Sequence, residues 1–548
     1  MNGAQVLLKT LKECGVDTLF GYPGGAVIPL YDALSREGHF RHLRTAHEQG
    51  AVHAADGYAR SSGKVGVCFA TSGPGATNTI TGLATAYMDS VPLLVITGQV
   101  ATPLLGRGSF QEVDTVGITF SVTKHNYLVR DVKQLPGIVK KAFEIARSGR
   151  PGPVLIDIPK DIFMKEFIDE DKSAFEEKND ESSFNRGDMD EIARLINESK
   201  RPVIYSGGGV KISAAEKELL RLAEKADIPI VNTLMGLGTT SRNHELSLGL
   251  VGMHGFKECN LAVVNCDLLL AVGARFSDRV IGDPSKFAAK SKIVHLDIDS
   301  SETHKNVDTY LAVVGDIKGM LKAIEEKIDE KDNKEWRREI ASWKVERKNK
   351  EDFSPHNILD SFYEKLGKET FVATDVGQHQ MWTAQYWPFN ESNKFLTSGG
   401  LGTMGYGLGA AIGAKVANPN QPVLLVTGDG SFRMNSNELF TVAQYDIPLV
   451  ILLMNNSALG MVRQWQRMFC DARYSETDVD DSVDYVKLVN AYGIEGHRVD
   501  SLDGLKEVLD KAQFGKKPIF IECKISKNES VYPIVPPGKS IDELLLEG

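Results

Sequence analysis

Short apolar runs that end at or just before a glycine recur along the chain. They cover residues 65–71, 93–97, 202–206, 268–272 and 423–427, and nearly every position in them is apolar. Such runs are typical of strands buried on both faces of a parallel sheet, since half-exposed strands alternate apolar and polar residues. Amphipathic helical patterns lie between them, as at 138–148 and 213–226. The pattern predicts an α/β fold, with ligand sites at the carboxyl ends of the strands.

The length of the chain and its charged segments predict three domains. With 548 residues, the chain is too long for a single hydrophobic core. We expect domains over 1–165, 188–330 and 355–526, each built on a mainly parallel sheet flanked by helices. The charge-rich segments 166–187 and 331–354 separate them as linkers. The last segment, 527–548, contains three prolines and is expected to form a C-terminal tail.

The composition narrows the classes of function. A formal net charge of −10 argues against a general nucleic-acid binder, which usually carries a basic surface. The six cysteines are scattered without a C-x-x-C pair, which indicates a reducing compartment. The apolar runs are much shorter than the roughly 20 residues of a membrane helix, and no leader peptide is visible at the N-terminus. We therefore expect a soluble, cytoplasmic protein without nucleic-acid or membrane partners.

The strongest chemical motif is Gly428-Asp429-Gly430, followed by Asn455-Asn456. Asp429 and Asn456 each follow a predicted buried strand, and adjacent parallel strands would bring both residues to one edge of the sheet. Carboxylate and amide oxygens are ligands that Mg²⁺ prefers, and the glycines allow a phosphate to approach the backbone. Either piece alone is most often an ordinary turn, whereas the two together in this strand context favour a magnesium–phosphate site.

The spacing of this motif resembles that of thiamin-diphosphate enzymes. The resemblance implies that Asp429, the Asn456 side chain and the Ala458 carbonyl hold Mg²⁺ on the diphosphate. Two further motifs fit the same family. Glu48, in His47-Glu-Gln-Gly50, would face the aminopyrimidine ring of the cofactor and exchange a proton with it, although such a glutamate alone is more often a helix N-terminal acid. Met404, in the glycine-rich segment 398–405, would prop the two cofactor rings into a bent conformation.

The whole chain is similar to the acetohydroxyacid synthase (acetolactate synthase) family. Ordered matches occur at 47–50, 72–78, 110–112, 148–153, 252–255, 273–276, 378–382, 461–466 and 531–538. The resemblance implies an enzyme of the transferase class that decarboxylates pyruvate and ligates the two-carbon group to a second 2-keto acid. Its products would be 2-acetolactate or 2-aceto-2-hydroxybutyrate, in branched-chain amino-acid biosynthesis. The three domains would then bind the pyrimidine ring, FAD, and the diphosphate with Mg²⁺, in chain order.

The same resemblance assigns residues to the substrate and to thiamin diphosphate. Arg279 would meet the carboxylate of the second keto acid, which calls for a fixed cation. Trp465 would line the pocket for that acceptor and favour 2-ketobutyrate, and Phe110, Gln111 and Lys160 would shape its entrance. The remaining thiamin-diphosphate positions would be Gly377, Gln378, His379, Gly402, Gly428, Gly430, Ser431 and Met461.

The resemblance also implies FAD in the middle domain, without a net redox role. Asp297 ends the strand-like run 293–298, where an acid can accept a ribose hydroxyl. Gly207-Gly-Gly209 follows a predicted strand and suits a phosphate. The expected flavin positions are Arg150, Gly207, Gly208, Gly209, Met253, His254, Gly273, Arg275, Asp297 and Asp316. Four family positions differ: a basic residue is usual at Ala46, an acid at Ser277, and a proline at Gly409 and at Val483. Of these, only Ser277 bears on the flavin assignment.

The expected partners are 2-keto acids and further protein subunits. By the resemblance, Glu48 of one subunit reaches the cofactor bound by another, which implies a homodimer or homotetramer, with a separate regulatory subunit as a further partner. Three alternatives stay open at this point. They are a flavin-dependent pyruvate oxidase or decarboxylase, a fermentative acetolactate synthase without flavin, and a non-catalytic scaffold. Retention of Glu48, Asp429 and Asn456 argues against the scaffold, which needs none of them.

Overall fold

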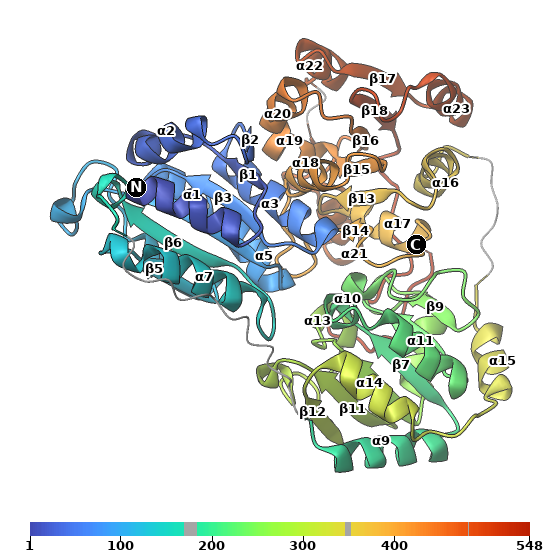
Figure 1. Cartoon of the computed structure of the whole chain (residues 1–548). Helices are drawn as coiled ribbons and strands as arrows, with labels where there is room; N and C mark the ends of the chain where they lie inside the picture. Colours follow the sequence, from blue (N-terminus) through green and yellow to red (C-terminus); the bar gives the residue numbers. More distant parts are fainter. Residues whose placement is uncertain (169–183, 346–351, 480–481, 548) are drawn as a thin grey trace. The chain divides into compact units, whose positions relative to one another are not determined.

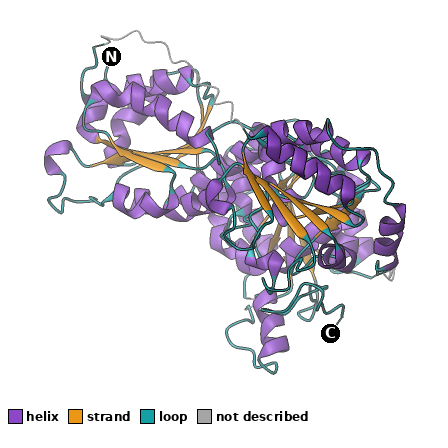
Figure 2. Ribbon diagram, turned by 90° about the horizontal axis from the view of Figure 1, so that it is seen from below, coloured by secondary structure: helices purple, strands orange, loops and turns teal. Residues whose placement is uncertain are grey.

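The computed structural model describes residues 1–168, 184–345, 352–479 and 482–547 (Figure 1). It contains three six-stranded sheets, and Figure 2 shows helices on both faces of the strands. The strands pair in parallel wherever their register is defined, as between β3 (Gly66–Ala70) and β4 (Leu93–Gln99). Every residue of these two strands is buried. The predicted α/β class is therefore confirmed.

The chain folds into two compact units. The first comprises Met1–Lys178, Glu369–Gln380 and Leu396–Lys527, and the second comprises Asn179–Lys368, Met381–Phe395 and Asn528–Gly548. The first unit thus holds both the N-terminal and the C-terminal sheet. The domain limits expected from the sequence stay a prediction, and the expected linker 331–354 includes the helix α15 (Lys334–Ser342). Most of the other expected linker, 166–187, lies outside the described residues.

The N-terminal sheet has the strand order β2-β1-β3-β4-β6-β5. Its other strands are β1 (Thr18–Gly21), β2 (Arg41–Arg44), β5 (His125–Leu128) and β6 (Val154–Pro159). The apolar faces of amphipathic helices cover this sheet, because every residue of the central strands β1, β3, β4 and β6 is buried. These helices are α1 (Gly3–Glu13), α2 (Ile28–Arg36), α3 (Glu48–Ser62), α5 (Ile80–Asp89), α7 (Leu135–Arg147) and α8 (Lys160–Met164).

The C-terminal sheet has the order β14-β13-β15-β16-β18-β17. Its strands are β13 (Phe371–Thr374), β14 (Phe395–Leu396), β15 (Val423–Gly428), β16 (Val450–Asn455), β17 (Glu495–Val499) and β18 (Ile519–Lys524). The associated helices are α17 (Gln378–Tyr386), α18 (Gly407–Ala417), α19 (Asp429–Asn435), α20 (Leu439–Gln444), α21 (Gly460–Phe469), α22 (Tyr485–Ala491) and α23 (Leu502–Lys511). The apolar runs of the sequence thus become the buried centre of this sheet.

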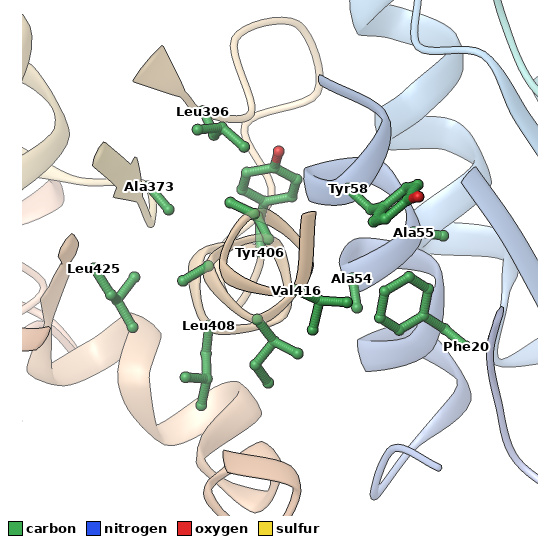
Figure 3. Packing of buried hydrophobic residues seen from close by; sticks show 14 of the residues in the cluster. Phe20, Ala54, Ala55, Tyr58, Ala373, Leu396, Tyr406, Leu408, Val416 and Leu425 are labelled. Atoms are coloured by element: carbon green, nitrogen blue, oxygen red, sulfur yellow. The ribbon is translucent and has the colours of Figure 1, made fainter. Parts of the chain in front are cut away.

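Helices α3 and α18 pack against each other and join the two sheets of the first unit (Figure 3). The helices approach so closely that only glycine fits at two positions of the contact. A Cβ on Gly413 would overlap the carbonyl oxygen of Ala54, and a Cβ on Gly57 would overlap that of Ala410. One continuous apolar cluster therefore runs from Phe20 in the N-terminal sheet through α3 and α18 into the C-terminal sheet.

The second unit holds the third sheet, with the order β12-β11-β10-β7-β8-β9. Its strands are β7 (Pro202–Ser206), β8 (Ile230–Asn232), β9 (Ser247–Leu250), β10 (Leu268–Val272), β11 (Lys292–Asp297) and β12 (Leu311–Val314). Its helices include α9 (Arg186–Glu198), α10 (Gly208–Ile212), α11 (Glu216–Lys225), α12 (Lys257–Asn265), α13 (Asp278–Ile281), α14 (Ile317–Glu325) and α16 (Pro355–Leu366). The bounds of β7 and β10 coincide with the two apolar runs identified in the sequence.

The segment after residue 527 is packed onto the second unit. Ile534 and Leu545 form an antiparallel bridge, and Ile541 is 1% exposed. The Asn260 side-chain amide donates to the Ile541 carbonyl at 2.8 Å. The C-terminal tail is thus ordered by backbone pairing and apolar burial. Across the described parts of the chain, no helix has the length and apolar character needed to cross a membrane.

Candidate active site

The predicted magnesium ligands follow neighbouring strands of the C-terminal sheet. Asp429 comes directly after β15 and begins α19, whereas Asn456 comes directly after β16. The two strands pair in parallel, with Gly428 in register with Met454. Both residues therefore lie at the same edge of the sheet. They also interact, because the backbone N–H of Asn456 helps to lower the pKa of the Asp429 carboxyl.

Asp429 is a buried carboxylate that lacks a full set of partners. It is 2% exposed, and its Oδ2 accepts no hydrogen bond from any residue that the structure describes. Burial raises its pKa to about 6, against the opposing effect of two backbone N–H groups and of Arg433. A buried anion with an unsatisfied oxygen raises the free energy of the folded state unless a cation binds to it. No cluster of three or more His, Cys, Asp or Glu side chains exists among the described residues, so a cation here needs amide and carbonyl ligands, a set that suits Mg²⁺.

The Asn456 side chain is fixed by a chain of amides. Its Nδ2 donates to Gln378 Oε1 at 3.1 Å, and Gln378 Nε2 donates to Gln464 Oε1 at 2.9 Å. The Oδ1 of Asn456 accepts a hydrogen bond of 3.2 Å from the backbone N–H of Ala458. The structure thus brings together Asn456, Ala458 and Gln378, which the sequence assigned to the metal and the cofactor. Gly460 must lack a Cβ, because one would overlap Gln378 Oε1.

Four further cofactor positions surround the start of α19. A Cβ on Gly428 would lie 2.8 Å from Nδ1 of His379, so the glycine lets the imidazole pack on the strand end. Burial lowers the pKa of His379 to about 3, which keeps the ring neutral at pH 7. Ser431 Oγ donates to the Val376 carbonyl at 3.0 Å, next to Gly377, whose φ is +154°. This group forms a cradle of backbone and small side chains, which suits a diphosphate.

Met404 lies beside the same motif. A Cβ on Gly430 would meet Met404 Cε at 3.6 Å, an ordinary van der Waals distance. The backbone after Met404 is held by Asn435, whose Nδ2 donates to the Gly405 carbonyl at 2.9 Å. Gly402 has a φ of +71°, which L side chains rarely adopt. The glycine-rich loop therefore has a defined conformation that places a thioether against the metal motif.

Glu48 is the first residue of α3 and is 8% exposed. Its Oε2 accepts a hydrogen bond of 3.0 Å from Asn78 Nδ2. Its Oε1 lies over Gly75, where a Cβ would approach to 3.2 Å. Gln111 packs beside Gly73, where a Cβ would lie 2.9 Å from Gln111 Cβ. The structure thus gathers two of the predicted catalytic residues around the segment 73–75, at the start of the short helix α4 (Pro74–Thr77).

The other predicted substrate residues of the first unit differ in exposure, since Lys160 and Trp465 are half-buried. Phe110 is 88% exposed, and Lys160 begins α8 directly after β6. Trp465 lies on α21, with its ring 5.7 Å from that of Phe469, and Met461 lies one turn earlier on the same helix. The exposed Phe110 side chain is available for contact with a substrate or with another protein chain.

The predicted flavin residues of the second unit lie at the carboxyl ends of its strands. Gly207 follows β7 as the N-cap residue of α10, which has no side-chain cap, and a Cβ on Gly207 would overlap the Gly273 carbonyl after β10. A Cβ on Gly209 would lie 2.6 Å from the Gly273 Cα, and Gly208 packs on Met235. Asp297 ends β11, with its Oδ1 accepting from the Asp299 N–H at 2.9 Å. An uncapped helix start beside a terminal acid fits the phosphate and ribose of a dinucleotide.

The remaining flavin residues have local roles as well. Asp316 caps α14, and its Oδ2 accepts from the Gly319 N–H at 2.7 Å. Met253 N–H donates to the Arg279 carbonyl at 2.8 Å, and Arg279 Nη1 lies 3.8 Å from Met253 Sδ. Arg275 and Ser277 precede α13, where the Ser277 hydroxyl serves as the N-cap. Arg150 belongs to the first unit and donates to Ser90 Oγ at 2.8 Å.

Comparison with known proteins decides the family. Models of thiamine pyrophosphate enzymes match as an N-terminal TPP binding domain over 1–118, a central domain over 189–324 and a C-terminal TPP binding domain over 375–523. The probable acetolactate synthase large subunit of Methanocaldococcus jannaschii is 46% identical, covering 100% of this chain and 95% of the relative. The acetolactate synthase isozyme 2 large subunit of Escherichia coli is 44% identical, covering 100% and 99%. The acetolactate synthase large subunit of Lactococcus lactis is 43% identical, covering 99% and 96%.

The chain belongs to the acetolactate synthase large-subunit family. Membership of this family confirms the predicted resemblance, the enzymatic character and thiamin diphosphate as cofactor. The roles of individual residues, the magnesium ion and the flavin stay predictions.

Several residues of this acetolactate synthase site escaped the sequence analysis. Asn78 holds Glu48, and Gln464 holds Gln378. Asn78 ends the matched segment 72–78, and Gln464 precedes Trp465, so their positions within matched motifs were available signals. Glu438, whose carboxylate accepts from the N–H groups of Ala46 and His47, gave no signal of its own.

Proposed function

We propose that this chain decarboxylates pyruvate and ligates the remaining two-carbon group to a second 2-keto acid. With pyruvate as acceptor the product is 2-acetolactate, and with 2-ketobutyrate it is 2-aceto-2-hydroxybutyrate, both precursors of branched-chain amino acids. The observation that carries the proposal is the buried, partly unsatisfied Asp429 beside Asn456, in a chain that keeps Glu48 fixed by Asn78. The names of the relatives support the same reaction.

The residues present fit the cofactors that this reaction needs. Asp429, the Asn456 side chain and the Ala458 carbonyl would hold Mg²⁺, and the glycines around α19 would receive the diphosphate. When bound, thiamin diphosphate supplies the carbon nucleophile and accepts the electron pair that stays behind when carbon dioxide leaves. FAD would occupy the strand ends of the second unit, as a bound group without a redox step.

The chain's own side chains orient the substrates and move protons. Glu48 would hold and exchange a proton at its Oε atoms, while Asn78 fixes the direction of that carboxylate. Arg279 would bind the carboxylate of the second keto acid through a charge-assisted hydrogen bond. Trp465 would line the acceptor pocket through apolar contact, and Phe110, Gln111 and Lys160 would shape its entrance and help to exclude water from the reacting carbon.

The assembly and location belong to the same proposal. We infer a homodimer as the minimum active species, because Glu48 would act on the cofactor held by a second copy, and a homotetramer would contain two such pairs. A smaller regulatory subunit would be a further partner, which the relatives' designation as large subunits supports. A cytoplasmic location is supported by six cysteines that all remain thiols.

A cofactor-omission series with a catalytic variant tests this proposal. Purified protein would be assayed with pyruvate after removal of thiamin diphosphate, Mg²⁺ or FAD in turn. We expect acetolactate formation to need all three, and Glu48→Gln to lower it by about 100-fold or more. Unchanged condensation by Glu48→Gln would refute the proposed mechanism. Full activity without FAD would instead favour a fermentative acetolactate synthase.

A further inference from the structure

The backbone just before Glu48 is held by one buried carboxylate from the C-terminal half of the first unit. Glu438 is 0% exposed. Its Oε2 accepts from the Ala46 N–H at 3.1 Å, and its Oε1 accepts from the His47 N–H at 3.0 Å. Thr441 Oγ1 donates a third hydrogen bond to Oε2 at 2.6 Å. The carboxylate thus accepts hydrogen bonds from two consecutive backbone N–H groups that directly precede Glu48.

Neighbouring contacts fix the same segment from the same side. The Arg44 N–H donates to the Tyr445 hydroxyl at 2.8 Å, and the Arg44 guanidinium lies 5.4 Å from the centre of the Phe440 ring. A Cβ on Gly50 would overlap the Glu438 carboxylate, so the helix that Glu48 begins is shaped to admit this side chain. The segment 44–50 is therefore docked on α20 and on the residues directly before and after it, Glu438 and Tyr445.

Packing alone does not need this carboxylate. Helices α3 and α18 already interlock through Gly57 and Gly413, and burial raises the pKa of Glu438, so the group costs stability when it is ionised. The Glu438 carboxylate instead orients the backbone, because the two hydrogen bonds that it accepts set the orientation of the peptide groups directly before Glu48. Positional errors of about 1 Å at a reacting group can cost about 100-fold in rate.

We propose that Glu438 is a positioning residue for Glu48, acting through the Ala46 and His47 peptide groups rather than by contact with substrate or cofactor. This inference rests on the proposed function, because it matters only if Glu48 exchanges protons with thiamin diphosphate. It also assigns a role to the stretch that follows the magnesium motif, since Asn435 holds the Met404 loop and Glu438 holds the Glu48 loop.

The test is the rate of hydrogen–deuterium exchange at C2 of bound thiamin diphosphate, measured by acid quench and proton NMR on the full-length holoenzyme. The variant is Glu438→Gln, whose amide keeps the size but cannot accept both hydrogen bonds. We expect the exchange rate and kcat to fall about tenfold or more, with the KM for pyruvate and the Kd for thiamin diphosphate within about twofold. Glu438→Asp, which keeps the charge, should recover part of the loss. An exchange rate within about twofold of the unmodified protein overturns the inference.

Two controls separate the possible failures. Glu218→Gln makes the same change at a carboxylate of the second unit that is 6% exposed, and it should leave exchange unchanged. If Glu438→Gln does not fold, Thr441→Val removes only the hydroxyl donor and should still slow exchange by about threefold, whereas an unchanged rate overturns the inference. Glu48→Gln identifies the level of failure. If it leaves exchange intact, the proposed function fails; if it abolishes exchange while Glu438→Gln does not affect it, only the present inference fails.

Discussion

The Asn78 side-chain amide donates a hydrogen bond of 3.0 Å to the carboxylate of Glu48. Asn78 directly follows the short helix α4 (Pro74–Thr77), whereas Glu48 begins α3, so this bond joins two separate segments that follow strands of the N-terminal sheet. A hydrogen bond to an ionised group contributes more than a neutral one, and it also fixes the plane of the carboxylate. The geometry that the proposed proton exchange needs is therefore built into the fold.

Replacement of Asn78 by alanine should lower activity without unfolding the protein. Without this bond the Glu48 carboxylate can turn away from its position, and errors of about 1 Å at a reacting group can cost about 100-fold in rate, so we expect kcat to fall by about tenfold to 100-fold. The protein should stay folded, with a loss of stability of about 1.5–3 kcal/mol. Steady-state kinetics with pyruvate measures this. Asn265→Ala is the matched control, because its amide donates only to the Leu261 carbonyl of α12 in the second unit. Equal losses in both variants would mean that the Asn78 effect is not specific to Glu48.

Asp429 should destabilise the metal-free protein at neutral pH. Burial raises its pKa to about 6 from the ordinary value of 3.8, so the folded state keeps a proton that the unfolded state has released. Stability therefore falls as the pH rises from about 4 to about 6 and stays lower above that range, by up to about 3 kcal/mol. We expect Asp429→Asn to be more stable than the unmodified protein in EDTA at pH 7.5 but not at pH 4.5. Thermal unfolding at both pH values measures the difference, and a variant that is less stable at both would contradict the account.

The same titration should make magnesium binding pH-dependent. A proton and Mg²⁺ compete for the Asp429 carboxylate, so the apparent affinity should fall about tenfold per pH unit below about 6. Calorimetric titration with Mg²⁺ at saturating thiamin diphosphate measures this. The affinity of Mg²⁺ for free thiamin diphosphate, measured at each pH, corrects for protonation of the diphosphate. A corrected affinity that does not change between pH 7.5 and 5 would exclude Asp429 as a ligand.

The contact between α3 and α18 should tolerate no added methyl group. A Cβ on Gly413 would overlap the Ala54 carbonyl, so Gly413→Ala must push the helices apart, at a cost of about 1–3 kcal/mol or more. Urea unfolding measures the loss. Gly137→Ala is the control, since that glycine lies on α7 with open space around it. It should be neutral or stabilising by about 0.5–1 kcal/mol, because alanine favours a helix.

Most of the strands and their α/β arrangement could be predicted from the sequence alone. Strands such as β7 and β10 are apolar at almost every position because helices cover both faces of the sheet, so their limits could be predicted within a residue. Asp429 and Asn456 could be placed at one sheet edge for the same reason, since both follow buried parallel strands. Local pattern was sufficient wherever the relevant partners lie on adjacent strands of one sheet.

Contacts between distant segments could not be predicted in this way. Glu438 and His47 are 391 residues apart, and nothing in the residues around Glu438 indicates that its carboxylate is buried against a loop of the N-terminal sheet. The need for glycine at Gly413 is likewise invisible in the sequence, because it depends on the Ala54 carbonyl of another helix. Such contacts depend on how two sheets pack, which hydrophobic periodicity does not encode.

The most direct test of the central claim is product analysis after incubation with pyruvate and 2-ketobutyrate, thiamin diphosphate, Mg²⁺ and FAD, with and without oxygen. The account predicts that both 2-aceto-2-hydroxybutyrate and 2-acetolactate form, and that the yield of each is the same with and without oxygen. Proton NMR of the quenched mixture identifies the products. Acetaldehyde as the main product, or acetate that appears only with oxygen, would contradict it. Either result would retain thiamin diphosphate as cofactor but show that no second keto acid is ligated.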